Sequence, residues 1–326
     1  MINSFQIATL CILILLNIQS SFAYNPLKKL NTNITIVELT VDDADRNRSI
    51  PILAYIPDTE EPLPVILFSH GLGGSRYSSS FLGRQWASRN YVAIFLQHKG
   101  SDLSIWKDKS IPEKFIDAKK AASIKNFKLR IYDVYSVLNQ LEKWNNTPQN
   151  HFYNRMDTSL IAMSGHSFGA ITTQAVSGQY FPKLDLNYTD KRIKAAVIFS
   201  PSPPKVGGTT KESFSKVSIP WMLMTGTNDS SPINQMTPEK RLEVFSSLPK
   251  EHKYQLVLNN ASHFAFSEHN LKRNSSPRNP NHHKAIMAIS TAFLDSYLKN
   301  DSNALIWLEE DSAKKILEHN DLLQKK

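Results

Sequence analysis

Residues 160–176 read LIAMSGHSFGAITTQAV, and within them Gly165-His166-Ser167-Phe168-Gly169 matches the pattern Gly-x-Ser-x-Gly. The apolar residues 160–163 predict a buried strand, and residues 170–176 predict the start of a helix. A sharp turn between the two strains the backbone at the serine, and the flanking glycines relieve the crowding. The hydroxyl is then exposed, and the helix N-terminus favours negative charge developing beside it. The pattern therefore predicts that Ser167 is a catalytic nucleophile, and the alternative is an ordinary glycine turn.

Short apolar runs recur on both sides of this motif. Continuous apolar runs of this length are typical of strands that are buried on both faces, as in a parallel sheet. The predicted strands lie at residues 34–41, 50–56, 65–68, 92–96, 160–163, 195–199, 221–224 and 255–258. Helical periodicity is clearest at residues 127–144, and the tail contains two more helical patterns at 283–298 and 304–317. Eight strands with interleaved helices predict one α/β domain over residues 24–326, with a mostly parallel sheet and helices on both faces.

A second glycine-rich loop, Ser69-His70-Gly71-Leu72-Gly73-Gly74, follows the strand at 65–68. Glycines let a loop turn so that its amide N–H groups point into a cleft, where two donors can hold the oxyanion of a tetrahedral intermediate. The predicted donors are the amides of Leu72 and of Phe168, the residue after the nucleophile. His70 is expected to brace the loop by hydrogen bonding.

Serine is a poor nucleophile at neutral pH unless an imidazole accepts its proton and a carboxylate orients that imidazole. Thr225-Gly226-Thr227-Asn228-Asp229 and Asn259-Asn260-Ala261-Ser262-His263 each lie just beyond a predicted strand. The resulting chain order of Ser167, Asp229 and His263 is that of a serine hydrolase triad on a parallel sheet. We therefore predict Asp229 as the acid and His263 as the base.

The composition excludes some classes of site and favours some classes of partner. The chain has 326 residues, of which 41% are hydrophobic, so it has ample material for a large core. Its single cysteine, Cys11, excludes internal disulfides and any cysteine-built metal site. The formal net charge of +9 favours anionic surfaces or substrates, and a solvated lysine-rich surface is preferred over a nucleic-acid role.

The first 23 residues resemble an export signal. An apolar run at residues 7–18 is too short to span a bilayer comfortably, and Ser21-Phe22-Ala23 offers small residues for cleavage after Ala23. No lysine or arginine precedes the run, so an uncleaved anchor is the alternative. We expect a secreted or periplasmic protein.

These motifs make the chain resemble the α/β-hydrolases of the dienelactone-hydrolase-like group, in particular its platelet-activating-factor-acetylhydrolase-like branch. The resemblance covers nearly everything after residue 34, and beyond the two glycine-rich loops it includes Arg76, Gln97-His98-Lys99-Gly100-Ser101-Asp102 and the helix at 291–298. It implies an α/β-hydrolase fold and a serine esterase or lipase-like enzyme that needs no metal or other cofactor.

One departure from the resemblance concerns the acid. The eukaryotic acetylhydrolases place it after the sixth strand, where this chain has Ser200-Pro201-Ser202-Pro203-Pro204 and no carboxylate. The acid is therefore expected after the seventh strand, as in dienelactone hydrolases and cutinase-like polyester hydrolases. Dienelactone hydrolases use a cysteine nucleophile where this chain has Ser167, so their own reaction is not expected.

The predicted function is hydrolysis of carboxylic esters, from small molecules or lipids, through an acyl-serine intermediate. A lipase or polyester hydrolase, and a catalytically silent binding protein with the same fold, are the alternatives. Residues 99–126 are either a cap over the site or a solvated loop. Residues 271–284 carry several basic side chains that predict a rim able to contact an anionic surface. Trp106, Phe168 and Phe264 are candidates to line an acyl pocket.

Overall fold

The computed structural model describes residues 24–326 except 108–109, 232, 234 and 269–278. The proposed signal, Cys11 and most of the predicted basic rim lie outside the described residues. Within the described part, the largest sheet runs in the order β1-β2-β4-β3-β5-β8-β9-β10-β11. Its strands are β1 (Ile34–Asp43), β2 (Arg48–Pro57), β3 (Leu63–Ser69), β4 (Val92–Leu96), β5 (Met156–His166), β8 (Ile193–Phe199), β9 (Trp221–Asn228), β10 (Lys253–Ser262) and β11 (Leu322–Lys325).

The middle of the sheet is parallel and its ends are antiparallel. Strands β4, β3, β5, β8, β9 and β10 all run in one direction, and β2 and β11 pair against them antiparallel at either side. All eight predicted strands are present. The ninth, β11, was not predicted because its sequence, Leu322-Leu323-Gln324-Lys325, is short and half polar.

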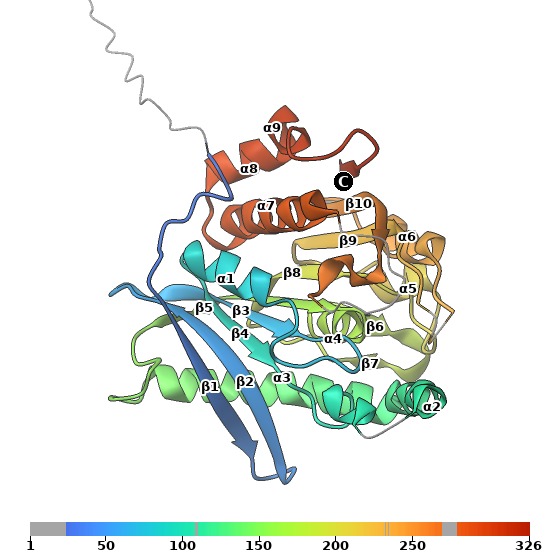
Figure 1. Cartoon of the computed structure of the whole chain (residues 1–326), viewed down its shortest axis with the longest axis horizontal. Helices are drawn as coiled ribbons and strands as arrows, with labels where there is room; N and C mark the ends of the chain where they lie inside the picture. The colour runs from blue at the N-terminus through green and yellow to red at the C-terminus, as the bar shows by residue number, and fades with distance from the viewer. Residues whose placement is uncertain (1–23, 108–109, 232, 234, 269–278) are drawn as a thin grey trace, which may run out of the picture.

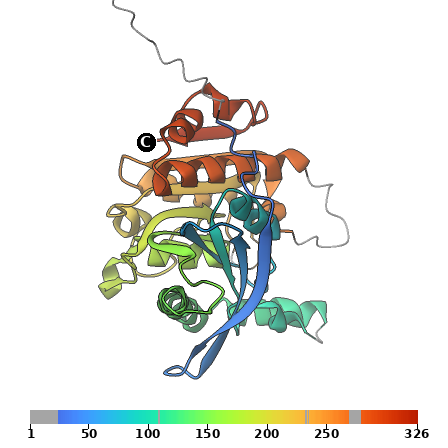
Figure 2. The same cartoon turned by 90° about the vertical axis from the view of Figure 1, so that its left-hand side faces the viewer.

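Helices cover both faces of this sheet (Figures 1 and 2). Among the described residues they are α1 (Ser80–Ser88), α2 (Ile111–Ala121), α3 (Ile124–Asn145), α4 (Phe168–Val176), α5 (Thr210–Phe214), α6 (Pro238–Ser247), α7 (Pro280–Leu298), α8 (Ser302–Glu309) and α9 (Asp311–Lys314). Shorter 3-10 turns lie at Leu103–Trp106, Pro182–Leu184 and His263–Phe266, and a small hairpin is formed by β6 (Tyr180–Phe181) and β7 (Leu186–Asn187).

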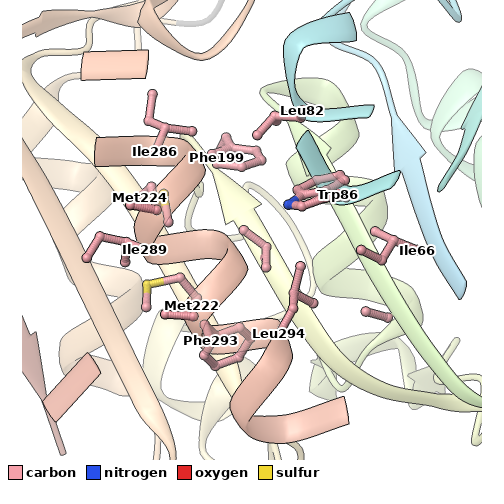
Figure 3. Packing of buried hydrophobic residues seen from close by; sticks show 14 of the residues in the cluster. Ile66, Leu82, Trp86, Phe199, Met222, Met224, Ile286, Ile289, Phe293 and Leu294 are labelled. Carbon is pink, nitrogen blue, oxygen red and sulfur yellow. The ribbon is translucent and has the colours of Figure 1, made fainter. Parts of the chain in front are cut away.

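Alternation along each strand feeds two separate cores. In β3, Ile66 and Phe68 point to the face covered by α1 and α7, whereas Val65 and Leu67 point to the face covered by α3. Figure 3 shows the first of these cores, where Trp86 of α1 lies across from Phe293 of α7. Because both faces are covered, the central strands are apolar throughout, as the sequence predicted.

The helical ends are set by local capping. The Ser123 side chain accepts a hydrogen bond from the Asn126 amide and begins α3, and the Asn279 side chain accepts from the Asn281 amide and begins α7 ahead of Pro280. The predicted helix at 304–317 is wrong as one element, because the backbone of Glu310 is extended and divides it into α8 and α9. Among the described residues, none of the helices has the combination of length and apolarity that a membrane span requires.

The parallel strands bring their carboxyl ends to one edge of the sheet. Strand β3 ends at Ser69, β5 at His166, β9 at Asn228 and β10 at Ser262. The loops that follow these four residues are the ones that the sequence singled out, so the fold gathers them at a common edge.

Candidate active site

Ser167 lies at the sharp turn between β5 and α4. Its backbone has φ 58° and ψ −111°, a positive-φ conformation outside the left-handed helical region that is strained for a residue with a side chain. A side chain on Gly169 would place its Cβ 1.8 Å from the Ser69 carbonyl oxygen, and one on Gly165 would place it 2.4 Å from the Gly169 oxygen. Both glycines are therefore required for β3, β5 and α4 to approach this closely.

The structure brings Ser167, His263 and Asp229 together as one hydrogen-bonded chain. His263 Nδ1 lies 2.7 Å from Asp229 Oδ1, and His263 Nε2 lies 2.9 Å from Ser167 Oγ. Since an ionised carboxylate can only accept, Nδ1 carries the proton and Nε2 is free to accept from the serine hydroxyl. Such a chain is able to move the hydroxyl proton onto the imidazole.

Asp229 is fully buried and remains ionised. Its Oδ2 accepts from the Thr225 hydroxyl at 2.9 Å, and Arg241 Nε lies 3.0 Å from its Oδ1. Burial by itself raises the pKa of Asp229, but the hydrogen bond and charge of His263 and the charge of Arg241 outweigh it and lower the pKa to about 2. The carboxylate is therefore charged at neutral pH.

Two carboxylates between the nucleophile and β8 in the sequence, Asp185 and Asp190, do not reach the imidazole in the described structure. Asp190 forms an ion pair with Arg192 at 2.6 Å, and Asp185 accepts from the exposed Tyr180 hydroxyl at 2.6 Å. Neither has a hydrogen bond to His263 in the described structure.

The amides of the loop after β3 differ in whether they have a partner. The Gly74 amide donates to the Gly71 carbonyl at 3.1 Å and the Gly73 amide donates to Ser101 at 2.9 Å. Among the described residues the Leu72 amide has no backbone partner, and Phe168, as the first residue of α4, has no intrahelical one. A Cβ on Gly71 would lie 3.5 Å from Ser167 Cβ, so this loop adjoins the serine.

A cavity of about 990 Å³ opens beside Ser167, His263, Leu72 and Phe168. Its lining is largely apolar and includes the three aromatic residues that the sequence proposed for it, Trp106, Phe168 and Phe264. Residues 99–126 contribute one wall, through the turn at Leu103–Trp106 and through α2. The sequence left two interpretations of this segment, a cap over the site or a solvated loop, and its contribution to the cavity wall agrees with the cap.

Sequence reasoning missed two buried arginines, Arg241 and Arg130. Arg241 of α6 also donates to the carbonyls of Asp229 and Ser200, at 2.8 Å each, and thereby ties the loops after β8 and β9 together. Arg130 of α3 lies under the loop after β3, with its guanidinium 4.4 Å from the centre of the Phe168 ring. Neither lies in a motif, and a lone arginine on a helix gives no signal in the sequence.

A family model described as platelet-activating factor acetylhydrolase, isoform II, matches residues 52–272. The chain belongs to this family. The match confirms the resemblance and the α/β-hydrolase fold, and it supports a hydrolase that acts on esters. The matched range contains Ser167, Asp229 and His263. No match to this chain was found among curated proteins.

The described residues at this edge of the sheet do not gather metal ligands. Within the part of the chain that the structure describes, no group of three or more His, Cys, Asp or Glu side chains is placed to hold a metal ion. His282 is instead buried, with its Nε2 3.0 Å from the Asn259 carbonyl oxygen, and His283 stacks on Phe81.

A buried histidine near the site predicts how stability depends on pH. Burial, with a contribution from the charge of Arg130, lowers the pKa of His98 to about 4, against about 6.5 for an unfolded chain. Between these values the unfolded state binds more protons, so stability falls as pH falls below about 6.5. Urea unfolding at pH 7 and pH 5 should show a loss of about 2 kcal/mol from this group.

His98→Asn provides the comparison, because Asn cannot titrate. The variant should be less stable at pH 7 but lose correspondingly less stability between pH 7 and pH 5. Equal losses in the two proteins would show that His98 is not responsible.

Proposed function

We propose that the protein is an exported serine hydrolase that cleaves carboxylic esters through an acyl-serine intermediate. The observation that supports this most directly is the hydrogen-bonded chain from Asp229 through His263 to Ser167 at the edge of a large apolar cavity. Membership of an ester-hydrolysing family agrees with it.

In the first half-reaction Ser167 Oγ attacks the ester carbonyl carbon and His263 Nε2 takes the hydroxyl proton. The carbonyl electron pair moves onto oxygen, and the amides of Leu72 and Phe168 stabilise the resulting oxyanion. The intermediate collapses, the bond to the leaving alkoxide breaks, and His263 gives that alkoxide its proton.

In the second half-reaction water attacks the acyl-serine while His263 accepts one of its protons. Collapse of the second tetrahedral intermediate releases the carboxylic acid, and the proton returns to Ser167. Asp229 stays charged throughout and stabilises the imidazolium. This sequence consumes one ester and one water and needs no cofactor.

The cavity supports a substrate with a sizeable apolar part. A volume of about 990 Å³ lies at the upper end of the range of ligand pockets and exceeds what an acetyl group would fill. A lipase acting on longer acyl chains is therefore the second candidate, and it uses the same residues.

A panel of p-nitrophenyl esters of increasing chain length tests the proposal. We expect hydrolysis without added metal, with kcat/KM rising from acetate to medium-chain esters. The absence of turnover for every ester, together with tight binding of one of them, would favour the silent binding protein.

Export is proposed from the first 23 residues. Expression of the full chain in a bacterium, followed by fractionation and N-terminal sequencing, should place the protein outside the cytoplasm with Tyr24 as its first residue. An intact N-terminus in the membrane fraction would favour the uncleaved anchor instead.

Leu72→Pro removes one proposed oxyanion donor. Because the amide has no backbone partner among the described residues, proline costs no internal hydrogen bond there. We expect a loss of about 3 kcal/mol of transition-state stabilisation, measured as a fall in kcat of about 100-fold. Circular dichroism must first show an intact fold, and a folded variant with near-normal kcat would mean that another amide is the donor.

A further inference from the structure

Arg130 is a completely buried cation whose partners are neutral groups around the loop after β3. Its Nη1 donates to the His70 carbonyl at 2.6 Å and to Ser69 Oγ at 3.3 Å, and its Nε donates to Ser101 Oγ at 2.8 Å. Its Nη2 also points at the carbonyls of Ser101 and Gly71, at 3.4 and 3.5 Å. One side chain thus contacts the loop at several points.

The charge of Arg130 is not balanced by a direct ion pair. In the described structure no carboxylate oxygen lies within 4 Å of its nitrogens, whereas Asp133 on the same helix is paired with Arg48 at 2.6 Å and with Arg46 at 3.0 Å. Burial lowers the pKa of Arg130 to about 9, so the group is still charged at neutral pH. Burying a cation without a direct ion pair costs desolvation free energy, and an apolar side chain of similar size would fill the same space without that cost.

The contacts also fix the direction of the Leu72 amide. The Gly71 carbonyl, which belongs to the same peptide plane, accepts from the Gly74 amide at 3.1 Å and lies 2.6 Å from His70 Nδ1. His70 Nε2 accepts from the His98 amide at 3.1 Å, so Nδ1 carries the proton and donates to Gly71. In a trans peptide the N–H points opposite to the C=O, so donors gathered on the carbonyl turn the Leu72 N–H away from Arg130.

The same guanidinium also contacts the other proposed oxyanion donor. Its carbon lies 4.4 Å from the centre of the Phe168 ring, within the range of a cation–π contact. Arg130 therefore touches both segments that supply the oxyanion amides, one through carbonyls and one through an aromatic face.

A second Ser–His–Asp chain holds Arg130 in place. Ser69 Oγ lies 2.9 Å from His98 Nε2, and His98 Nδ1 lies 3.0 Å from Asp133 Oδ2. All three residues are fully buried, so no substrate reaches Ser69 and the chain is not a second active site. Its effect is to orient the Ser69 hydroxyl so that its oxygen accepts from Arg130.

We propose that Arg130 is a positioning residue for the oxyanion site, which holds the Leu72 and Phe168 amides in place and stabilises the oxyanion with its buried charge. The inference rests on the proposed function. Asp133 and Asp102 act on this cation only from a distance. The proposed role accounts for the absence of a direct ion pair among the described residues, since an oxyanion at the Leu72 and Phe168 amides adds negative charge beside it only while the tetrahedral intermediate exists.

Arg130→Met and Arg130→Lys test this with two independent readouts. In Arg130→Met we expect kcat for p-nitrophenyl butyrate to fall about 100-fold while KM changes less than about 3-fold, because the group acts in the transition state. Arg130→Lys keeps the positive charge but lacks the several N–H donors of the guanidinium. Its kcat should therefore lie between that of the wild type and that of Arg130→Met. Arg89→Met is the matched control, since Arg89 is also buried but pairs with Asp295.

Amide hydrogen exchange of residues 70–74 is the second readout and does not depend on catalysis. Exchange there should rise in Arg130→Met and stay at the wild-type level in Arg89→Met. An Arg130→Met protein with unchanged exchange in this loop, or with kcat within 3-fold of the wild type, would overturn the inference. If the wild type hydrolyses no ester the proposed function fails, and the exchange result still decides whether Arg130 holds the loop.

Discussion

Ser167→Ala is expected to lower ester hydrolysis at least about 1,000-fold, because removal of Oγ leaves no path through an acyl-serine. The substitution removes only the hydroxyl group, whose Oγ lies 2.9 Å from His263 Nε2. The variant should fold as the wild type does, because alanine keeps the Cβ at the strained turn. The measurement is kcat/KM for the best p-nitrophenyl ester, with thermal unfolding as the check on the fold.

A fluorophosphonate probe gives an independent result for the same residue. It should label the wild type at Ser167, as located by peptide mass spectrometry, and leave Ser167→Ala unlabelled. Ser164→Ala is the matched control, since Ser164 lies on β5 just before the turn, with its hydroxyl buried and without a hydrogen-bond partner among the described residues. Labelling of another serine, or comparable activity in Ser167→Ala, would show that the nucleophile has been misassigned.

The second large effect is expected for Asp229→Asn, which should reduce kcat by about 10,000-fold. Asparagine keeps the size of the side chain but loses the charge that selects the Nδ1-protonated form of His263 and stabilises its imidazolium. The loss of the negative charge also leaves Arg241 without the carboxylate that now lies 3.0 Å from its Nε. KM should change much less than kcat, because Asp229 is buried and does not line the cavity.

Asp185→Asn and Asp190→Asn are the controls for that experiment. Each removes one carboxylate that lies between the nucleophile and β8 in the sequence, and each should leave kcat within a few-fold of the wild type. Should one of them abolish activity while Asp229→Asn retains most of it, the assignment of Asp229 as the acid would be wrong.

Much of this architecture was predictable because it depends on short-range patterns. A strand covered on both faces has to be apolar at every position, so the central strands β3, β4, β5, β8 and β9 are each visible as apolar runs. The serine turn was visible for a related reason, since the close approach of Ser69 to Gly169 excludes every residue larger than glycine. The helical periodicity at 127–144 placed the ends of α3 only to within a few residues of Ile124 and Asn145.

Other features could not be predicted because they depend on neighbours that are distant in the sequence. The strand β11 is half polar and is held by pairing with β10, so its own residues carry little signal. The turn at Leu103–Trp106 and α2 could equally have been solvated, and only their contacts with the cavity distinguish a cap from a loop.

The sequence by itself determined the α/β class, the glycines of the two site loops and the order of Ser167, Asp229 and His263 along the chain, because each reflects a local requirement of backbone or burial. Only the tertiary structure decided how closely Asp229 approaches the imidazole, at 2.7 Å, and that Arg130 and Arg241 lie behind the site. The physical reason is that a charge is positioned by all the groups around it. Those groups come from separate strands and helices, and the fold alone brings them within hydrogen-bond distance.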